Sequence, residues 1–356
     1  MSISAARRLL PVGRPGSAAA PSFLRGGQRS RLGIEIAGDS LRIAQHLRRG
    51  AAERWRCGEL SLPSPTAAPA AAGRRARRAP ATAGSRFRAG RATAVCTSPL
   101  IDVFPLNLER DDDAPVAQRV VEQARDRLDY PIEEAVLDFN LLPPAVQRPG
   151  DDDLTVLVYA APRALIEHWV ASLDHLNWYV DCLITPGCVL APRIEHPLRD
   201  ARHLVISIAG IATSLSVVQF GEVLLERILP WGEQGLLERL QAELDLSTAQ
   251  SERLLQQSDP AATVQEILAP LFTELVQEAD GCLAYCDAYF SPTTTTALLL
   301  VGSLAAHAAL QRFLERELGL PRRDATQSLQ LLGGEEIDPA FAAAACGALW
   351  EPEGEG

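Results

Sequence analysis

The sequence predicts an α/β protein built from two similar halves. Two segments read as copies of one another, Gly33 to Ser40 (GIEIAGDS) and Ile206 to Thr213 (ISIAGIAT). Each ends an apolar strand in a turn of small residues and leads into a second strand with alternating apolar positions. A chain of 356 residues is also long enough for two domains, each with its own core. We therefore expect two half-domains that face a shared cleft.

The first half is predicted to open with a meander of three strands, followed by helices and further strands. The strands are expected at 32–36, 41–47, 55–62, 92–108, 134–141, 154–160 and 178–184, and the helices at 116–128, 163–176 and 189–194. Segment 92–108 should be broken by Pro99 and Pro105, because proline cannot donate to the hydrogen bonds between strands. Apolar residues at helical spacing predict the helix at 116–128.

The second half repeats this order. Strands are expected at 203–209, 213–220, 222–229 and 295–301, and helices at 232–244, 249–257, 261–289, 304–318 and 340–350. Asp338 and Pro339 supply an N-cap and a first-turn proline for the last helix. Because the order of meander, helix, strand and helix occurs twice, we expect parallel and antiparallel strands in the same sheet.

Composition divides the chain into four parts. Residues 1–30 are expected to form a disordered basic tail, 31–202 a first domain with an inserted subdomain, 203–337 a second domain, and 338–350 a helix that packs back toward the first domain. Within the first domain, the Ala- and Arg-rich stretch 63–93 is expected to be a disordered loop.

The net charge of −11 argues against nucleic acid as the main ligand. The charge is uneven, however, because two tracts are rich in arginine. They contain Arg7, Arg8, Arg14, Arg25, Arg29 and Arg31 in the first tract, and Arg74, Arg75, Arg77, Arg78, Arg86, Arg88 and Arg91 in the second. A disordered tail and loop, a contact with anionic lipid and, for the first tract, an organelle-targeting peptide all remain open.

Residue types exclude several kinds of chemistry. The chain has no lysine, which rules out a P-loop lysine, a Schiff-base lysine and a lysine general base. Its seven cysteines are scattered without a CxxC pair, so we expect buried thiols and no metal site. No spacing of Ser, His and Asp indicates a catalytic triad, and no apolar stretch reaches the ~20 residues of a membrane helix. We predict no catalytic residue and no metal ligand.

An ordered series of motifs from residue 32 to about residue 350 resembles the actin and sugar-kinase superfamily and, within it, the type IV pilus assembly protein PilM family. The motifs are GIEIAGDSLR at 33–42, PIEEAVLDF at 131–139, VLVYAA at 156–161, RILPWG at 227–232, LLVGS at 299–303 and PAFA at 339–342. The resemblance implies a duplicated actin/ribonuclease H-like fold of two domains with a central interdomain cleft for a nucleotide.

The resemblance also implies which residues would hold ATP and Mg²⁺ in that cleft. The first loop would embrace phosphates through Gly38, Asp39 and Ser40, and the second through the segment that contains Gly210 and Thr213. Gly302 and Ser303 match the stretch that approaches the adenosine in relatives, and Glu274 resembles the acid that contacts the base or ribose. Small-residue turns that present backbone N–H groups suit this role.

Both loops depart from the pattern of the relatives, which carry Asp-x-Gly in each. Here the first reads Glu35-Ile36-Ala37 and the second Ser207-Ile208-Ala209. Glu35 can still reach Mg²⁺ through water, whereas Ser207 cannot replace a carboxylate. Ala37 and Ala209 place methyl groups where the backbone should meet phosphate. We therefore expect a degenerate nucleotide site.

The function implied by the resemblance is that of a scaffold. Such a protein would be cytoplasmic and peripheral to the inner membrane, would bind the N-terminal tail of an inner-membrane pilus assembly protein, and would contact the membrane only through that partner. Association with further copies of the chain is left open. One alternative is an active actin-like ATPase that binds and hydrolyses ATP. A second is a cytoplasmic component of a type II secretion system, whose L-type proteins share this architecture, or of a mannose-sensitive pilus.

Overall fold

The computed structural model describes residues 31–38, 40–49, 52–61, 87, 90–109, 114–148, 153–174, 176, 178–195, 198–255, 257, 261–331 and 337–351. The basic tail at 1–30, most of the stretch 63–93, and Asp39 lie outside these residues.

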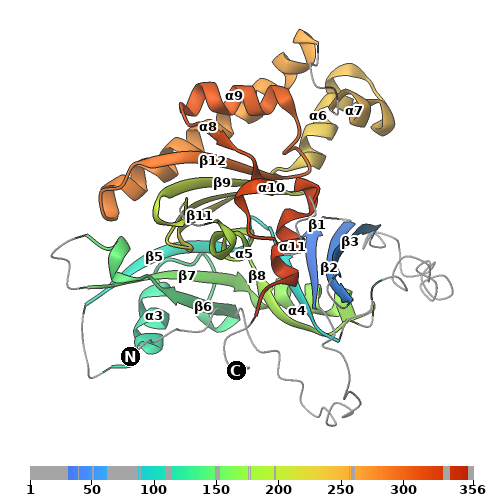
Figure 1. The fold of residues 1–356 in the computed structure, drawn as a ribbon. Coiled ribbons are helices and arrows are strands. Elements are labelled where there is room, and N and C mark those ends of the chain that lie inside the picture. Colours follow the sequence, from blue (N-terminus) through green and yellow to red (C-terminus); the bar gives the residue numbers. More distant parts are fainter. Residues whose placement is uncertain are drawn as a thin grey trace.

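The first half contains a sheet of five strands, which we call sheet I (Figure 1). Its strands are β1 (Leu32–Ala37), β2 (Ser40–Arg49), β3 (Ala52–Ser61), β4 (Ala92–Cys96) and β8 (Val180–Ile184), in the order β3-β2-β1-β4-β8. β1, β2 and β3 form an antiparallel meander, while β4 and β8 run parallel to β1. Every residue of the central strand β1 is buried, as expected for a strand covered on both faces. β4 begins inside the stretch 63–93 that was expected to be a loop.

A smaller sheet is inserted between β4 and β8. It contains β5 (Asp102–Leu108), β6 (Ala135–Leu141) and β7 (Leu154–Pro162) in the order β5-β7-β6, and it packs with α3 (Val116–Ala124) around a small core. The expectation that Pro105 breaks its strand was wrong, because Pro105 lies inside β5. β5 is an edge strand, where the missing N–H of proline can be tolerated. α4 (Arg163–Asp174) then leads back toward β8.

The second half contains sheet II, with the same topology as sheet I. Its strands are β9 (Arg202–Ile208), β10 (Thr213–Gln219), β11 (Glu222–Leu229), β12 (Thr295–Gly302) and β13 (Arg322–Arg323), in the order β11-β10-β9-β12-β13. Again a three-strand antiparallel meander is extended by parallel strands. The helices that accompany it are α6 (Glu233–Leu244), α7 (Thr248–Leu255), α8 (Ala262–Tyr289), α9 (Ala308–Leu318) and α10 (Ala325–Ser328). The repeated strand order confirms the predicted duplicated α/β fold.

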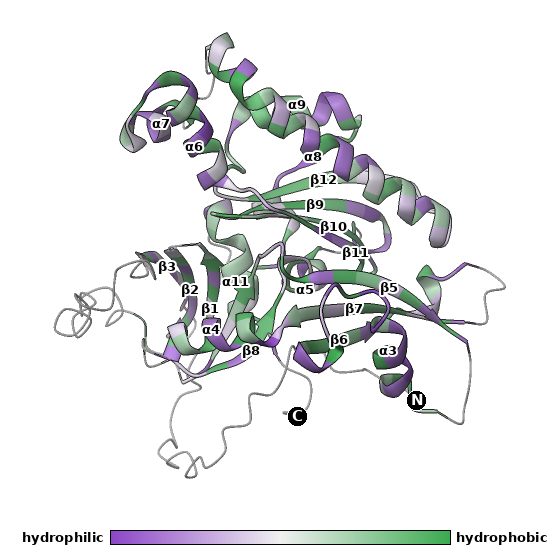
Figure 2. Ribbon diagram, turned by 180° about the vertical axis from the view of Figure 1, so that it is seen from behind, coloured by the Kyte–Doolittle hydropathy of each residue, from purple (hydrophilic) through white to green (hydrophobic). Residues whose placement is uncertain are grey.

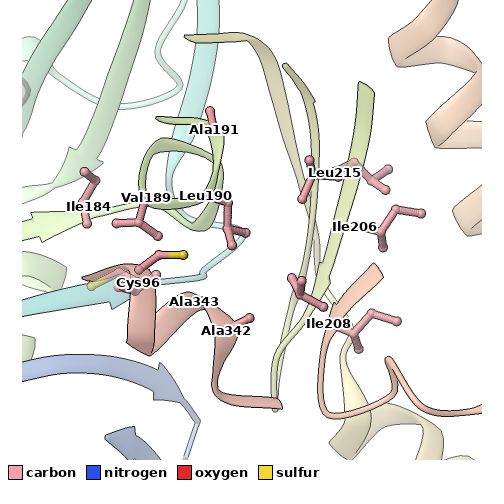
Figure 3. Packing of buried hydrophobic residues seen from close by; sticks show 14 of the residues in the cluster. Cys96, Ile184, Val189, Leu190, Ala191, Ile206, Ile208, Leu215, Ala342 and Ala343 are labelled. Carbon is pink, nitrogen blue, oxygen red and sulfur yellow. The ribbon is translucent and has the colours of Figure 1, made fainter. Parts of the chain in front are cut away.

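Two short helices lie between the sheets. They are α5 (Pro186–Leu190), which starts three residues before the predicted helix 189–194, and α11 (Ala342–Ala348). Figure 3 shows Val189 and Leu190 of α5 and Ala342 and Ala343 of α11 on one side of a common core, with Ile206, Ile208 and Leu215 of sheet II on the other. A Cβ at Gly33 of β1 would collide with the carbonyl oxygen of Ala344, so α11 lies directly against the backbone of sheet I. Small residues make this close packing possible.

Polar and apolar residues are distributed as this arrangement requires. Figure 2 shows apolar residues concentrated in the strands, and hydrophilic residues spread over the outer helices α7, α8 and α9. Among the helices that the structure describes, none is both long enough and apolar enough to span a membrane.

Candidate functional site

The two hairpin loops predicted to embrace phosphates are in contact with each other. The first joins β1 to β2 and the second joins β9 to β10. Gly38 has a φ of +76°, and a Cβ at this position would lie 2.5 Å from Cγ2 of Ile211. A Cβ at Gly210 would collide with the carbonyl oxygen of Ala37. These two contacts join the halves of the chain at their loops.

The second loop also accepts hydrogen bonds from the first turn of α6. The N–H of Glu233 donates to the carbonyl oxygen of Ala209 at 3.0 Å, and that of Gln234 donates to Gly210 at 2.8 Å. The hydroxyl of Thr213 donates to the carbonyl oxygen of Trp231 at 2.8 Å. The first N–H groups of a helix are the donors that bind anions in many nucleotide sites. In α6 two of these donors are already bound to the protein's own loop.

Glu35 of β1 is fully buried and lies near one cation. Its Oε2 is 3.7 Å from Nη1 of Arg42, which is close enough for an ion pair but too long for a hydrogen bond. Burial raises the pKa of Glu35 to about 7, because the cost of desolvating the carboxylate outweighs the attraction of Arg42. Arg42 also reaches Glu233 of α6, at 3.1 Å. Arg42 therefore links the two halves beside the loop contact.

Ser207 is the counterpart of Glu35 in the second half. It is buried in the centre of sheet II, paired with Ser214 of β10 and Val301 of β12. Neither its hydroxyl nor the carboxylate oxygens of Glu35 have a hydrogen-bond partner among the described residues. Mg²⁺ is usually held in proteins through one or two carboxylates, and Ser207 offers none.

These observations test whether the loops fit magnesium and a triphosphate. The fit needs space between the loops and a second carboxylate beside the first. Within the part of the chain that the structure describes, no group of three or more His, Cys, Asp or Glu residues is placed to hold a metal ion. Ala37 and Gly210 are in close contact where the two loops meet. Among the residues that the structure describes, which do not include Asp39, the two loops therefore do not fit the group that the resemblance implies.

The other predicted site residues are not gathered at one place. Gly302 and Ser303 lie against the second loop's strand, since a Cβ at Gly302 would collide with the carbonyl oxygen of Ile208, and the N–H of Ser303 donates to the same oxygen at 3.1 Å. Ser40 instead points toward β3, where its hydroxyl donates to Glu59 at 2.6 Å. Glu274 is half-buried on α8. Asp39 lies outside the described residues.

A buried carboxylate that sequence reasoning missed lies at the junction of the two halves. Glu226 of β11 is 1% exposed and accepts hydrogen bonds from the hydroxyls of Thr185 (2.5 Å) and Ser214 (2.6 Å) and from the N–H of Gly187 (3.0 Å). Burial raises its pKa, and these hydrogen bonds oppose the shift. Glu226 therefore holds the start of α5 against sheet II. An acidic residue at an inward position of an apolar strand (EVLLERIL) was the signal that could have found it.

Comparisons with known proteins agree with the fold. A family model described as type IV pilus assembly protein PilM matches residues 104–328. Among solved structures, a PilM–PilN type IV pilus biogenesis complex matches with a TM-score of 0.70 and 21% identity, covering 90% of this chain and 98% of that chain. Ethanolamine utilization protein EutJ from Carboxydothermus hydrogenoformans matches with a TM-score of 0.49 and 12% identity, over 92% of this chain and 91% of that one. The search of curated proteins gave no match.

Proposed function

Because the chain belongs to the type IV pilus assembly protein PilM family, we propose that it is a cytoplasmic scaffold that binds the N-terminal tail of an inner-membrane pilus assembly protein. The observation that carries the proposal is the similarity in fold to a PilM that was solved together with PilN, over nearly the whole of both chains.

The tail is proposed to dock as an extended strand at the outer edge of β6, which is an edge strand of the inserted sheet. The N–H of Leu142 donates to Thr155 beside β7, at 2.9 Å. Since alternate residues of an antiparallel strand face the same neighbour, the N–H groups of Phe139 and Leu141 face away from β7. The N–H of Phe139 is bound only locally, to the carboxylate of Asp138 at 2.8 Å. A peptide strand could replace that bond and pair with this edge.

Side chains along β6 support recognition as well as pairing. Residues 137–141 are all half-buried, so their side chains remain partly accessible to the alternate side chains of an added strand. Arg163 at the start of α4 donates to the carbonyl oxygen of Ala135 at 3.1 Å, which closes the edge at that end. The open part of the edge therefore runs from Leu137 to Leu141.

Titration calorimetry tests the proposal. The probe is a synthetic peptide with the N-terminal tail of the single-span inner-membrane protein encoded beside this chain. Phe139→Pro removes the outward N–H, and Phe139→Ala is the matched control that keeps it. We expect the peptide to bind about 10-fold more weakly to the proline variant than to the alanine variant, the value of one hydrogen bond of about 1.4 kcal/mol. A wild-type protein that ignores the peptide refutes the scaffold, whereas equal binding by both variants refutes only the docking at β6.

The nucleotide site is proposed to be degenerate. Three features support this: the contact between the loops, the serine at position 207, and a Glu35 carboxylate whose pKa is raised to about 7 by burial. Phosphoryl transfer depends on charge neutralisation and positioning, for which these loops offer little. Hydrolysis of ATP with Mg²⁺ well above background by the purified wild-type protein would overturn this part of the proposal.

A further inference from the structure

Three segments of the chain meet at one end of sheet I. The N–H of Leu32, at the start of β1, donates to the carbonyl oxygen of Arg91, and the N–H of Ala92 donates to Tyr179 before β8. β2 runs in the opposite direction, and because Leu32 pairs with Gln45, the rest of β2, up to Arg49, extends beyond the start of β1 by about 13 Å. The β2–β3 hairpin therefore projects from the same end as the starts of β1, β4 and β8. We call this surface the open end of sheet I.

The open end lies away from the second half. The opposite end of β1 carries Gly38, which contacts Ile211 of the second loop. Since strands of one sheet run side by side, the starts of β1, β4 and β8 are a full strand length away from that contact. The open end is not involved in the contact between the two loops.

Arginines gather at this end. Arg48 and Arg54 of the hairpin are both exposed, with 75% of the Arg48 side chain accessible, and 49% of the Arg91 side chain is accessible as well. The acidic neighbours are engaged: Glu53 lies 3.8 Å from Arg48, and Asp181 pairs with Arg31 and lies 3.8 Å from Arg91. Because Arg31, Arg48, Arg54 and Arg91 outnumber Glu53 and Asp181 by two, this set of described residues carries a net positive charge.

An exposed aromatic side chain lies among these charges. Tyr179 is 53% exposed, immediately before β8 and hydrogen-bonded through its backbone to the start of β4. Tyrosine beside arginine is the combination found where proteins meet the headgroup region of a membrane, because the ring enters the interface while the hydroxyl and the cations stay with the headgroups.

The charge is also uneven along the sequence. Residues 1–100 contain 18 arginines and 4 acidic residues, whereas residues 101–356 contain 16 arginines and 41 acidic residues. Arg31 and Arg91, the last arginines of the two arginine-rich tracts of the sequence, lie at the open end of sheet I. A negative surface would therefore attract the first hundred residues and repel the remainder of the chain.

We propose that the open end of sheet I binds directly to the surface of a bilayer containing anionic phospholipid. This goes beyond the expectation of contact through a protein partner alone, and it does not depend on the proposed docking of a peptide. Anionic lipid is favoured over nucleic acid because the chain's net charge of −11 opposes a polyanion that it would have to wrap, whereas a flat surface meets only the basic end.

Flotation with vesicles tests the proposal. The full chain is mixed with vesicles of phosphatidylcholine alone or with roughly a third phosphatidylglycerol. We expect binding only to the anionic vesicles. The double variant Arg48→Gln/Arg54→Gln should reduce the partition constant about 30-fold, which corresponds to about 1 kcal/mol for each arginine. The matched control Arg253→Gln/Arg316→Gln changes the net charge equally on α7 and α9 and should leave binding unchanged.

Two further measurements identify the kind of contact. Tyr179→Ser should weaken binding to the anionic vesicles relative to the wild type. The ratio of the two partition constants should be the same in ~1 M salt, where charge interactions are screened within about 3 Å. The proposal is refuted if the chain does not bind anionic vesicles, if the Arg48/Arg54 variant floats as well as the wild type, or if the control pair loses binding equally. Tighter binding to duplex DNA than to the vesicles would assign the surface to nucleic acid instead.

Discussion

Glu35 makes the stability of this protein depend on pH. Its carboxylate is fully buried, the nearest cation is 3.7 Å away, and burial raises its pKa from 4.5 to about 7. A carboxyl with a raised pKa binds its proton more tightly in the folded state. It therefore costs nothing below about pH 4.5, its cost grows as pH rises, and above about pH 7 that cost reaches its full value of roughly 3 kcal/mol.

The variant Glu35→Gln removes this dependence. Glutamine is neutral at every pH and of similar size, and Arg42 keeps its ion pair with Glu233 at 3.1 Å. We expect the free energy of unfolding of the variant, relative to that of the wild type, to rise by about 2 kcal/mol between about pH 5.5 and about pH 8. Urea unfolding followed by circular dichroism at both pH values measures the difference.

The exposed Glu252 of α7 provides the control. Glu252→Gln should change stability by less than ~0.5 kcal/mol at either pH, as is usual for surface positions. If Glu35→Gln shows the same difference from wild type at both pH values, Glu35 is ionised at low cost in the folded protein. The description of a buried, poorly paired carboxylate would then be wrong.

Two further predictions concern packing. Glu226→Ala leaves three buried donors without their acceptor and should reduce the free energy of unfolding by about 3–5 kcal/mol. Glu226→Gln keeps one acceptor oxygen and should reduce the free energy of unfolding by less. Chemical denaturation of both variants measures the difference. Gly210→Ala forces a methyl group against the carbonyl oxygen of Ala37 and should destabilise the protein by about 1–3 kcal/mol. The control is Gly281→Ala on α8, where a Cβ meets nothing within 4 Å, and it should stabilise the protein by up to about 1 kcal/mol. Equal effects of the two variants in thermal melts would contradict the contact between the loops.

Much of the fold could be predicted because local patterns repeat. The copies at 33–40 and 206–213 indicated two meanders, and both sheets have that topology. The helix expected at 261–289 is α8, Ala262–Tyr289, in spite of Pro270 within it. Helix ends were less accurate: the helix expected at 304–318 begins at Ala308, after the imidazole of His307 caps its first turn.

The candidate site was harder to predict because it depends on how the two halves are placed. The sequence shows glycines at 38 and 210, and such residues suit a phosphate loop as well as a close contact between backbones. Only the placement of Ile211 over Gly38 and of Gly210 against Ala37 distinguishes the two. Glu226 was missed for a similar reason, because its partners Thr185 and Gly187 lie about forty residues away in sequence.

The proposal of a degenerate site names two obstacles to nucleotide binding, the contact between the loops and the missing carboxylate at position 207. Removing the second obstacle alone tests them separately. Ser207→Asp supplies the carboxylate that the resemblance to the family implies for the second loop but leaves the contact between the loops in place. If the missing carboxylate were the only obstacle, this variant should bind ATP in a manner that depends on Mg²⁺. We expect calorimetry to detect no binding, because Gly210 still lies against Ala37 and the first donors of α6 remain bound to Ala209 and Gly210. Since position 207 is 1% exposed, a buried charge will also lower stability, and circular dichroism must show that the variant is folded. Binding by the folded variant would mean that the loops can separate, and that the lost carboxylate alone silenced the site.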